Sequence, residues 1–155
     1  MKIRSIIANS RKNAFELKTG KRTLLLPYCR CEPKPTKEDP VASVGVDREL
    51  GDEGFTYQLR TGREGTVHIE QVLEYNQDPA YMRDLLLHKL TIEAQKRLET
   101  SELSRREIIR RLGTSATQFY RLIDQTNYTK SIDQLLVLLY ILDCNVDLVV
   151  RARVA

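Results

Sequence analysis

Serine followed three positions later by glutamate or glutamine occurs three times between residues 104 and 134. A serine hydroxyl at a helix start accepts a hydrogen bond from the backbone N–H three residues on, and the Glu or Gln side chain bonds back. Each pair precedes apolar residues, so the pattern predicts three short helices that begin at these serines. The pairs are Ser104/Glu107, Ser115/Gln118 and Ser131/Gln134.

Positive charge is concentrated in the same segment. Residues 104–130 contain six cations and two anions, a net charge of +4 that equals the charge of the whole chain. Arginine, lysine and helix N-termini are the groups that contact phosphate oxygens. The segment therefore suits a nucleic-acid partner, and a simply solvated helix face is the alternative interpretation. The cations are Arg105, Arg106, Arg110, Arg111, Arg121 and Lys130.

The first two predicted helices are joined by a very short turn, residues 112–115. Gly113 suits the left-handed position that ends a helix, and Ser115 starts the next helix almost at once. Two helices with so short a connection cross at a steep angle, which is helix-turn-helix geometry. The apolar residues expected to hold this angle are Ile108, Ile109, Leu112, Phe119 and Leu122.

The run from Leu103 to Ser115 resembles the helix-turn-helix of the Cro and lambda-repressor type, also called the XRE family. The resemblance covers residues 80–150 at most, and segments 127–136 and 142–146 are similar to the subset found as antitoxins in toxin–antitoxin pairs. It departs from the family at Ile109, where alanine is usual, which implies a slightly wider or tilted helix pair.

With Phe119 and Leu122 directed inward, the outer face of the helix over 116–123 is free to enter a major groove. By the resemblance, Arg121 bonds guanine O6 and N7 and Thr117 touches a thymine methyl. The residues expected to contact bases are Ala116, Thr117, Tyr120 and Arg121. The residues expected to contact phosphates, at helix starts and in the loop that follows, are Arg105, Ser115 and Lys130.

The remaining segments predict an α+β fold with two domains. Residues 1–76 are expected to form a small antiparallel β-rich domain that is a candidate partner-binding part, with a proline-bearing exposed loop at 32–40. Residues 77–155 are expected to form an all-helical helix-turn-helix domain with a C-terminal strand. Its first helix runs from Pro79 to Thr100 after an Asp78 cap. The predicted strands are 2–8, 14–19, 22–26, 54–60, 66–73 and 146–154.

Two segments of the N-terminal half look alike. Residues 15–21 parallel residues 57–63, and both contain a Thr-Gly-Lys/Arg turn. Either the half arose by duplication, or β-propensity and turn chemistry produced two similar hairpins independently.

Several function classes are disfavoured. No apolar run approaches the roughly 18 to 20 residues that span a bilayer, so we expect a cytoplasmic protein without a membrane partner. Cys29, Cys31 and Cys144 do not complete a metal site, so no metal or cofactor is expected. His68 and His88 accompany no phosphate-binding loop or nucleophile motif, so we expect no enzyme.

These observations predict a sequence-specific DNA-binding transcriptional regulator, and the resemblance implies an antitoxin that represses its own promoter and binds a cognate toxin. The alternative is an adaptor that binds a toxin or other partner without DNA. A homodimer is expected because one helix-turn-helix reads few base pairs. Its pairing surface would be the apolar helix over 132–142 or the final strand, unless the β-rich half covers both.

Overall fold

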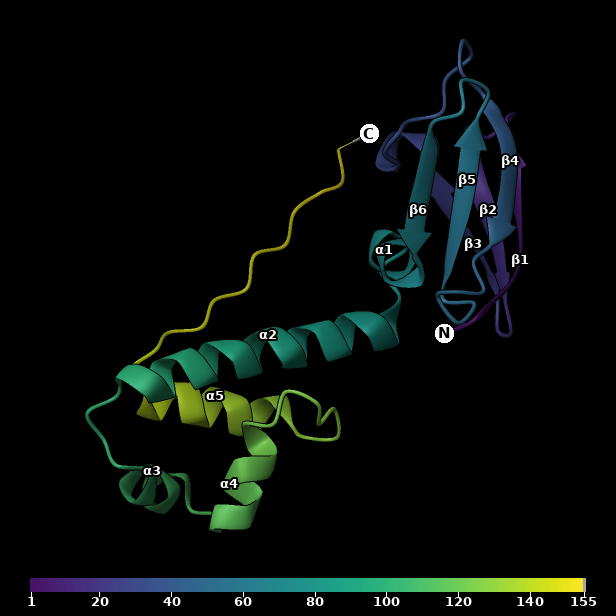
Figure 1. The fold of residues 1–155 in the computed structure, drawn as a ribbon. Coiled ribbons are helices and arrows are strands. Elements are labelled where there is room, and N and C mark those ends of the chain that lie inside the picture. Colours follow the sequence, from purple (N-terminus) through teal and green to yellow (C-terminus); the bar gives the residue numbers. More distant parts are fainter. Residues whose placement is uncertain (155) are drawn as a thin grey trace. The chain divides into compact units, whose positions relative to one another are not determined.

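A computed structural model describes residues 1–154 and has an α+β architecture with two three-stranded antiparallel sheets and five α-helices (Figure 1). The α+β prediction is confirmed. The chain divides into two compact units, Met1–Met82 and a second that starts at Arg83. This division lies inside a long helix, a few residues after the boundary expected from the sequence.

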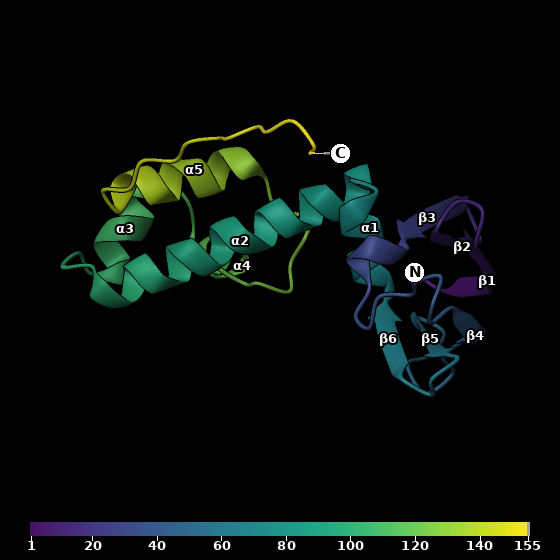
Figure 2. The same cartoon turned by 90° about the horizontal axis from the view of Figure 1, so that it is seen from above.

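The first unit contains both sheets, which Figure 2 shows as two facing layers. The first sheet has the order β1 (Ile3–Asn9), β2 (Ala14–Thr19), β3 (Thr23–Pro27), followed by the 3-10 turn η1 (Tyr28–Arg30). The second sheet has the order β4 (Val41–Val46), β5 (Gly54–Leu59), β6 (Glu64–His68), followed by α1 (Ile69–Tyr75).

The core of this unit lies between the central strands of the two sheets. Phe15 and Leu17 of β2 and Phe55 and Tyr57 of β5 are all buried. The rings of Phe15 and Phe55 have centroids 5.0 Å apart. Alternate residues of both strands therefore face one shared apolar layer, as expected for sheets with one buried face.

The two sheets repeat one another. A register shift lies between Ile3 and Ser5 in the first sheet and between Val41 and Ser43 in the second. Buried and exposed positions alternate identically along β2 and β5, and again along β3 and β6. A shared irregularity and a shared burial pattern support a true duplication.

The structure aligns the two sheets differently from the sequence comparison. The two alignments are offset by two residues. Phe15 and Phe55 occupy the same place in their sheets, because each pairs with the equivalent residue of the first strand, Ala8 or Val46. The sequence comparison matches Phe15 with Tyr57 instead. A slip of two residues keeps every side chain on its face of the sheet, so the alternation alone does not reveal it.

The second unit contains a bundle built around the long helix. Its helices are α2 (Pro79–Thr100), whose first four residues belong to the first unit, and α3 (Arg105–Leu112), α4 (Ala116–Leu122) and α5 (Ile132–Ile141). The bounds predicted for α2 are confirmed, and the Asp78 carboxylate accepts the Tyr81 N–H at 2.9 Å. The buried residues of the bundle are Leu87, Ala94, Ile108, Leu112, Phe119, Leu122, Leu135, Leu138 and Leu139.

Three predictions for the first unit need correction. The strand expected over 66–73 ends at His68, whose imidazole accepts the Glu70 N–H at 3.3 Å and caps α1. The strand β4 was not expected at all. The loop over 32–40 is not uniformly exposed, because Asp39 is buried and bonded to the β5–β6 turn.

The predicted C-terminal strand is wrong. The structure assigns no strand to residues 146–154, and the side chains of Leu148 and Val150 are 75% and 85% exposed. An alternating sequence supplies the propensity for a strand, but a strand needs a neighbour to hydrogen-bond with.

Candidate nucleic-acid interface

The two short helices and the tight turn that the serine spacing predicts are present as α3 and α4. Ser104 Oγ accepts the Glu107 N–H at 3.1 Å, and Ser115 Oγ accepts the Gln118 N–H at 3.2 Å. Between them Gly113 has φ 70°, the left-handed conformation that ends α3 and that glycine adopts without steric cost. The turn thus has the local chemistry that its sequence predicts.

A small apolar core lies beneath the two helices. Ile108 and Leu112 of α3 and Phe119 and Leu122 of α4 are buried, as predicted. Ile109 is half-buried and packs against the same core, so the larger residue at this position is accommodated at the margin. This packing fixes which face of α4 is turned outward.

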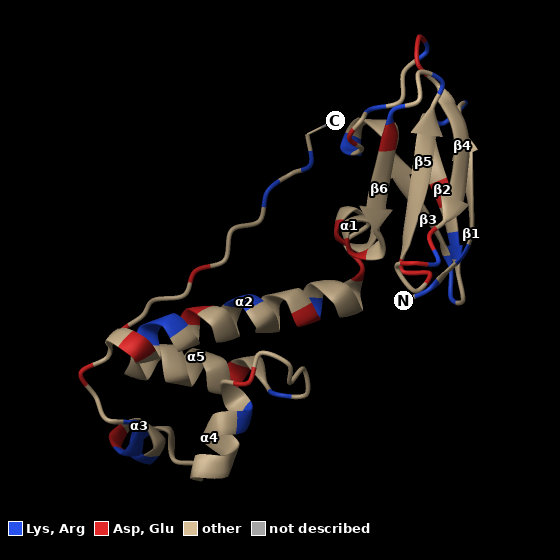
Figure 3. Ribbon diagram, in the orientation of Figure 1, with Lys and Arg blue, Asp and Glu red and all other residues tan. Residues whose placement is uncertain are grey.

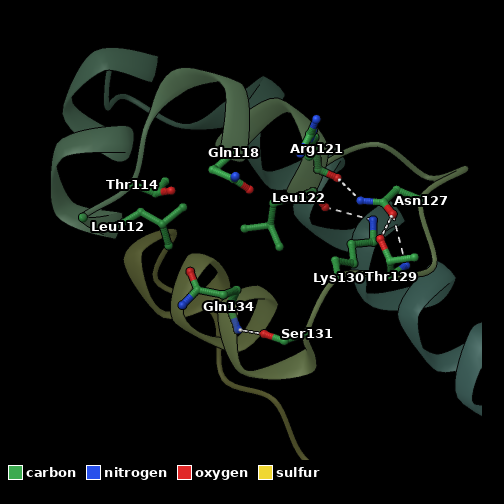
Figure 4. Close-up of a pocket in the computed structure, with 11 residues that line it drawn as sticks. Leu112, Thr114, Gln118, Arg121, Leu122, Asn127, Thr129, Lys130, Ser131 and Gln134 are labelled. Atoms are coloured by element: carbon green, nitrogen blue, oxygen red, sulfur yellow. Dashed lines mark hydrogen bonds between the residues drawn. The ribbon is translucent and has the colours of Figure 1, made fainter.

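The outward face of α4 carries the four residues predicted to contact bases. All four side chains are exposed, and that of Tyr120 is 52% exposed with its ring edge-on to Phe119. The Arg121 side chain points away from Leu122 (Figure 4). Gln118 is also exposed and was missed by the sequence analysis, which assigned it only to a helix cap. The four predicted residues are Ala116, Thr117, Tyr120 and Arg121.

The C-terminal end of α4 is held by side chains from three places in the second unit. Lys130 Nζ donates to the carbonyls of Leu122 and Asp124 at 2.9 and 2.6 Å. Asn127 Nδ2 donates to the Arg121 carbonyl at 3.1 Å. Gln95 Nε2, from α2, donates to the Ile123 carbonyl at 2.7 Å. Carbonyls that a helix end normally leaves unpaired are therefore satisfied here.

Lys130 therefore has a structural partner set that the sequence did not indicate. An ammonium has three N–H donors, and two of them are used on carbonyls, which leaves one for a phosphate. Burial lowers the pKa of this ammonium, while the nearby Asp124 carboxylate opposes that shift. The other two predicted phosphate contacts are exposed, Arg105 in the first turn of α3 and Ser115 at the start of α4.

Two of the arginines in this segment are paired within α3. The Glu107 carboxylate accepts from Arg110 Nε at 2.9 Å and from Arg111 Nε at 3.0 Å, rather than bonding back to Ser104. These bonds lower the pKa of Glu107 to about 2. Within residues 1–154, the cations of this segment without an ion pair are Arg105, Arg106, Arg121 and Lys130, and Lys130 bonds to two backbone carbonyls.

A polar hollow of about 360 Å³ adjoins the inner edge of this surface (Figure 4). It lies between α4, the α3–α4 turn and the start of α5, where Ser131 Oγ accepts the Gln134 N–H at 3.2 Å. Gln118, Arg121 and Thr129 line it with Gln134. The hollow is lined by donors and acceptors rather than by acids, so it is compatible with a sugar–phosphate chain.

The three cysteines are free and lie in different environments, Cys29 exposed, Cys31 buried and Cys144 half-buried. Burial, with a smaller effect of Cys29, raises the pKa of Cys31 to about 11, so its thiol stays protonated at neutral pH. Residues 1–154 contain no group of three or more His, Cys, Asp or Glu side chains placed to hold a metal ion. None of the helices in this range is long and apolar enough to cross a membrane.

Comparison with known proteins adds no relative. No protein family, curated protein or solved structure matches the chain.

Proposed function

We propose that the chain binds double-stranded DNA in a sequence-specific way through α4 and regulates transcription. The observation that supports this proposal best is the exposed outer face of α4, which carries Thr117, Tyr120 and Arg121 on a helix capped at both ends. A helix held in this way presents its side chains to base edges without first having to be ordered.

In this proposal α3 crosses the DNA backbone. Arg105 and Ser115 contact phosphates at the starts of α3 and α4, and the remaining N–H of Lys130 contacts a third. Phosphate contacts of this kind set register and affinity, whereas the outer face of α4 sets sequence preference. No catalytic step, metal or cofactor is required.

The experiment that tests the proposal is selection of bound duplexes from a random DNA pool by the full chain at a stated salt concentration. We expect a recurring motif of a few base pairs per half-site. Recovery of duplexes without any shared motif would contradict sequence-specific binding. It would favour the second candidate, an adaptor that binds a toxin or other protein without DNA.

The antitoxin role rests on the resemblance of residues 127–136 and 142–146 to antitoxins of the Cro and lambda-repressor type. In that role the first unit is the candidate toxin-binding part. Binding of the protein to a fragment of its own promoter, and the presence of a toxin-sized gene beside its own, are the observations that distinguish an antitoxin from another regulator.

We also propose that the protein acts as a homodimer through α5. The second unit leaves one face of this helix exposed, with Leu136 at 38%, Val137 at 42% and Tyr140 at 78%. The tail over 146–154 adds further exposed apolar side chains. A contiguous apolar face of this kind indicates a partner, and a second copy would place two α4 helices symmetrically for two half-sites.

A further inference from the structure

We propose that a basic cleft on the first unit binds the phosphate backbone of duplex DNA, an inference that rests on the proposed DNA-binding function and adds a second contact surface to it. The cleft has a volume of about 830 Å³ and lies beside the N-terminal end of β1. Four cationic side chains and one acidic side chain line it, namely Lys2, Arg4, Lys21, Arg48 and Asp52.

The cations come from three separate segments that the fold brings together. Lys2 and Arg4 flank the first residue of β1, Lys21 lies in the β2–β3 turn and Arg48 lies in the β4–β5 loop. Figure 3 shows Lys and Arg segments at this end of the first sheet. The Ile3 N–H bonds to the Asp52 carbonyl at 2.8 Å, which fixes the β4–β5 loop beside β1.

The irregularity in β1 determines where Arg4 lies. The register of the β1–β2 pair shifts between Ile3 and Ser5, so Arg4 has no partner in β2. Such irregularities re-aim a side chain out of the regular ladder. The Arg4 guanidinium lies against the turn at Gly20, next to Lys21.

Acidic groups next to the cleft are bonded to other partners, except Asp52, whose carboxylate lines the cleft and forms no ion pair within the described residues. The Asp47 carboxylate accepts from the Glu49 N–H at 2.9 Å and from the Thr56 hydroxyl at 3.0 Å. Glu53 pairs with the N-terminal amine of Met1, which also lines the cleft, at 3.2 Å. Within the described chain, the four cations that line the cleft form no ion pair.

The second sheet provides an internal comparison at the equivalent place. The matching registers put Pro40 where the first sheet has Lys2, and Ala42 where it has Arg4. In both sheets an arginine of the second turn has an acidic partner, Arg22 with Asp78 and Arg63 with Asp39. The shared fold does not require Lys2 and Arg4, because proline and alanine take their places in the second sheet.

The chemistry of the cleft favours nucleic acid over an acidic protein. Several unpaired cations spread over a wide, open hollow match a row of phosphates, each of which is a separate charge. A protein partner would be expected to bury aromatic or large apolar anchors. No aromatic residue lines the cleft.

The test compares the full chain with Lys21→Gln/Arg48→Gln, which removes two cleft charges from exposed, unpaired positions. Binding of a labelled random-sequence duplex of about 30 base pairs is measured between about 50 and 200 mM NaCl. We expect the slope of log K against log salt to fall by about two units, because each lost phosphate contact removes about 0.9. The control Arg11→Gln/Lys34→Gln removes the same charge outside the cleft and should change the slope by less than about half a unit.

The outcomes separate this proposal from the proposed function. If the cleft variant has the slope of the control while the protein still prefers its selected duplex, the cleft proposal is wrong and the proposed function stands. If the protein prefers no sequence but the cleft variant still lowers the slope by about two units, the cleft stands and sequence-specific function fails. The wild type, the cleft variant and the control variant should have the same melting temperature, because none of the four replaced side chains has a bonding partner to lose in the described part of the chain.

Discussion

The ammonium of Lys130 lies 2.9 Å from the carbonyl oxygen of Leu122, the last residue of α4. It bonds at the same time to the Asp124 carbonyl at 2.6 Å. A lysine that the sequence suggests as a phosphate contact is therefore also part of the cap that holds the proposed recognition helix. The two roles make different predictions.

Replacing Lys130 with Met should destabilise the free protein. The change leaves two carbonyls without their charged donor, and we expect the free energy of unfolding to fall by about 1 to 2 kcal/mol. Chemical denaturation without DNA measures this loss, and Lys89→Met on the exposed side of α2 is the control. The salt slope of DNA binding should fall by about one unit at most, since one N–H is left for phosphate. Unchanged stability would show that the carbonyl contacts contribute nothing.

Asp39 should make the first unit sensitive to acid. Hydrogen bonds from the Thr61 hydroxyl and backbone, and from Arg63, lower the pKa of this carboxyl in the folded state. Its contribution to stability is therefore complete above the unfolded pKa of about 3.9 and is lost as the pH falls through the lower folded pKa.

The measurement is the difference in free energy of unfolding between the wild type and Asp39→Asn as a function of pH. The wild type should be more stable near neutral pH, and its advantage should shrink below about pH 4. Glu38→Gln, an exposed neighbour in the same loop, should show no such pH-dependent difference. A constant difference from pH 7 to pH 2 would contradict the assignment.

Tyr57 and Gly65 should be energetically coupled. They pair across β5 and β6, and a Cβ at Gly65 would overlap the Tyr57 ring. The equivalent pair in the first sheet is Leu17 and Leu24. We expect Gly65→Ala to cost about 1 to 3 kcal/mol through overpacking. Gly45→Ala should cost less because nothing lies within 4 Å of its Cβ position.

The double variant Tyr57→Leu/Gly65→Leu reproduces the pair of the first sheet. It should recover part of the stability lost in Gly65→Leu alone, although it gives up the bond from the Tyr57 hydroxyl to the Pro33 carbonyl at 2.6 Å. A double-mutant cycle measures the coupling. If the losses in free energy of unfolding of the two single variants simply add, the side chains at positions 57 and 65 are not coupled, and the proposed equivalence with Leu17 and Leu24 is wrong.

Leu136→Glu on the exposed face of α5 should dissociate the proposed dimer. Sedimentation at micromolar concentration should give a species near twice 17.9 kDa for the wild type and near 17.9 kDa for the variant. Leu86→Glu is a matched control, because Leu86 on α2 is 42% exposed and Leu136 is 38% exposed. Deletion of residues 146–155 should leave the dimer intact. A wild-type monomer at low salt would rule out α5 as a stable pairing surface.

Local capping chemistry made the helical part of the fold predictable. The serines before α3, α4 and α5, and Asp78 before α2, each accept the backbone N–H three residues on, because a cap depends on residues only three positions apart. The return bond expected from Glu107 does not form, because its carboxylate accepts from Arg110 and Arg111 instead. The outer face of α4 followed from the positions of Phe119 and Leu122, since helical geometry fixes the opposite face.

Features that depend on distant partners were not predictable in this way. The tail over 146–154 has the alternation of a strand but no pairing neighbour, and β4 contains Gly45, which weakens a strand pattern. The apolar residues after β6 suggested a longer strand, because the sequence analysis did not identify His68 as the residue that caps α1. The contacts of Lys130 and Gln95 with the end of α4 depend on the tertiary fold of the second unit.

The most direct test of sequence-specific binding through α4 compares affinities for the selected duplex and a scrambled duplex at one salt concentration. For the wild type we predict a ratio of at least about 10³. Arg121→Ala should lose about 1 to 3 kcal/mol on the selected duplex, with relaxed preference at one base pair and little change on the scrambled one. Arg97→Ala, an exposed arginine of α2, should retain the wild-type ratio. Equal affinity of the wild type for both duplexes, or equal loss on both in Arg121→Ala, would contradict base reading by α4.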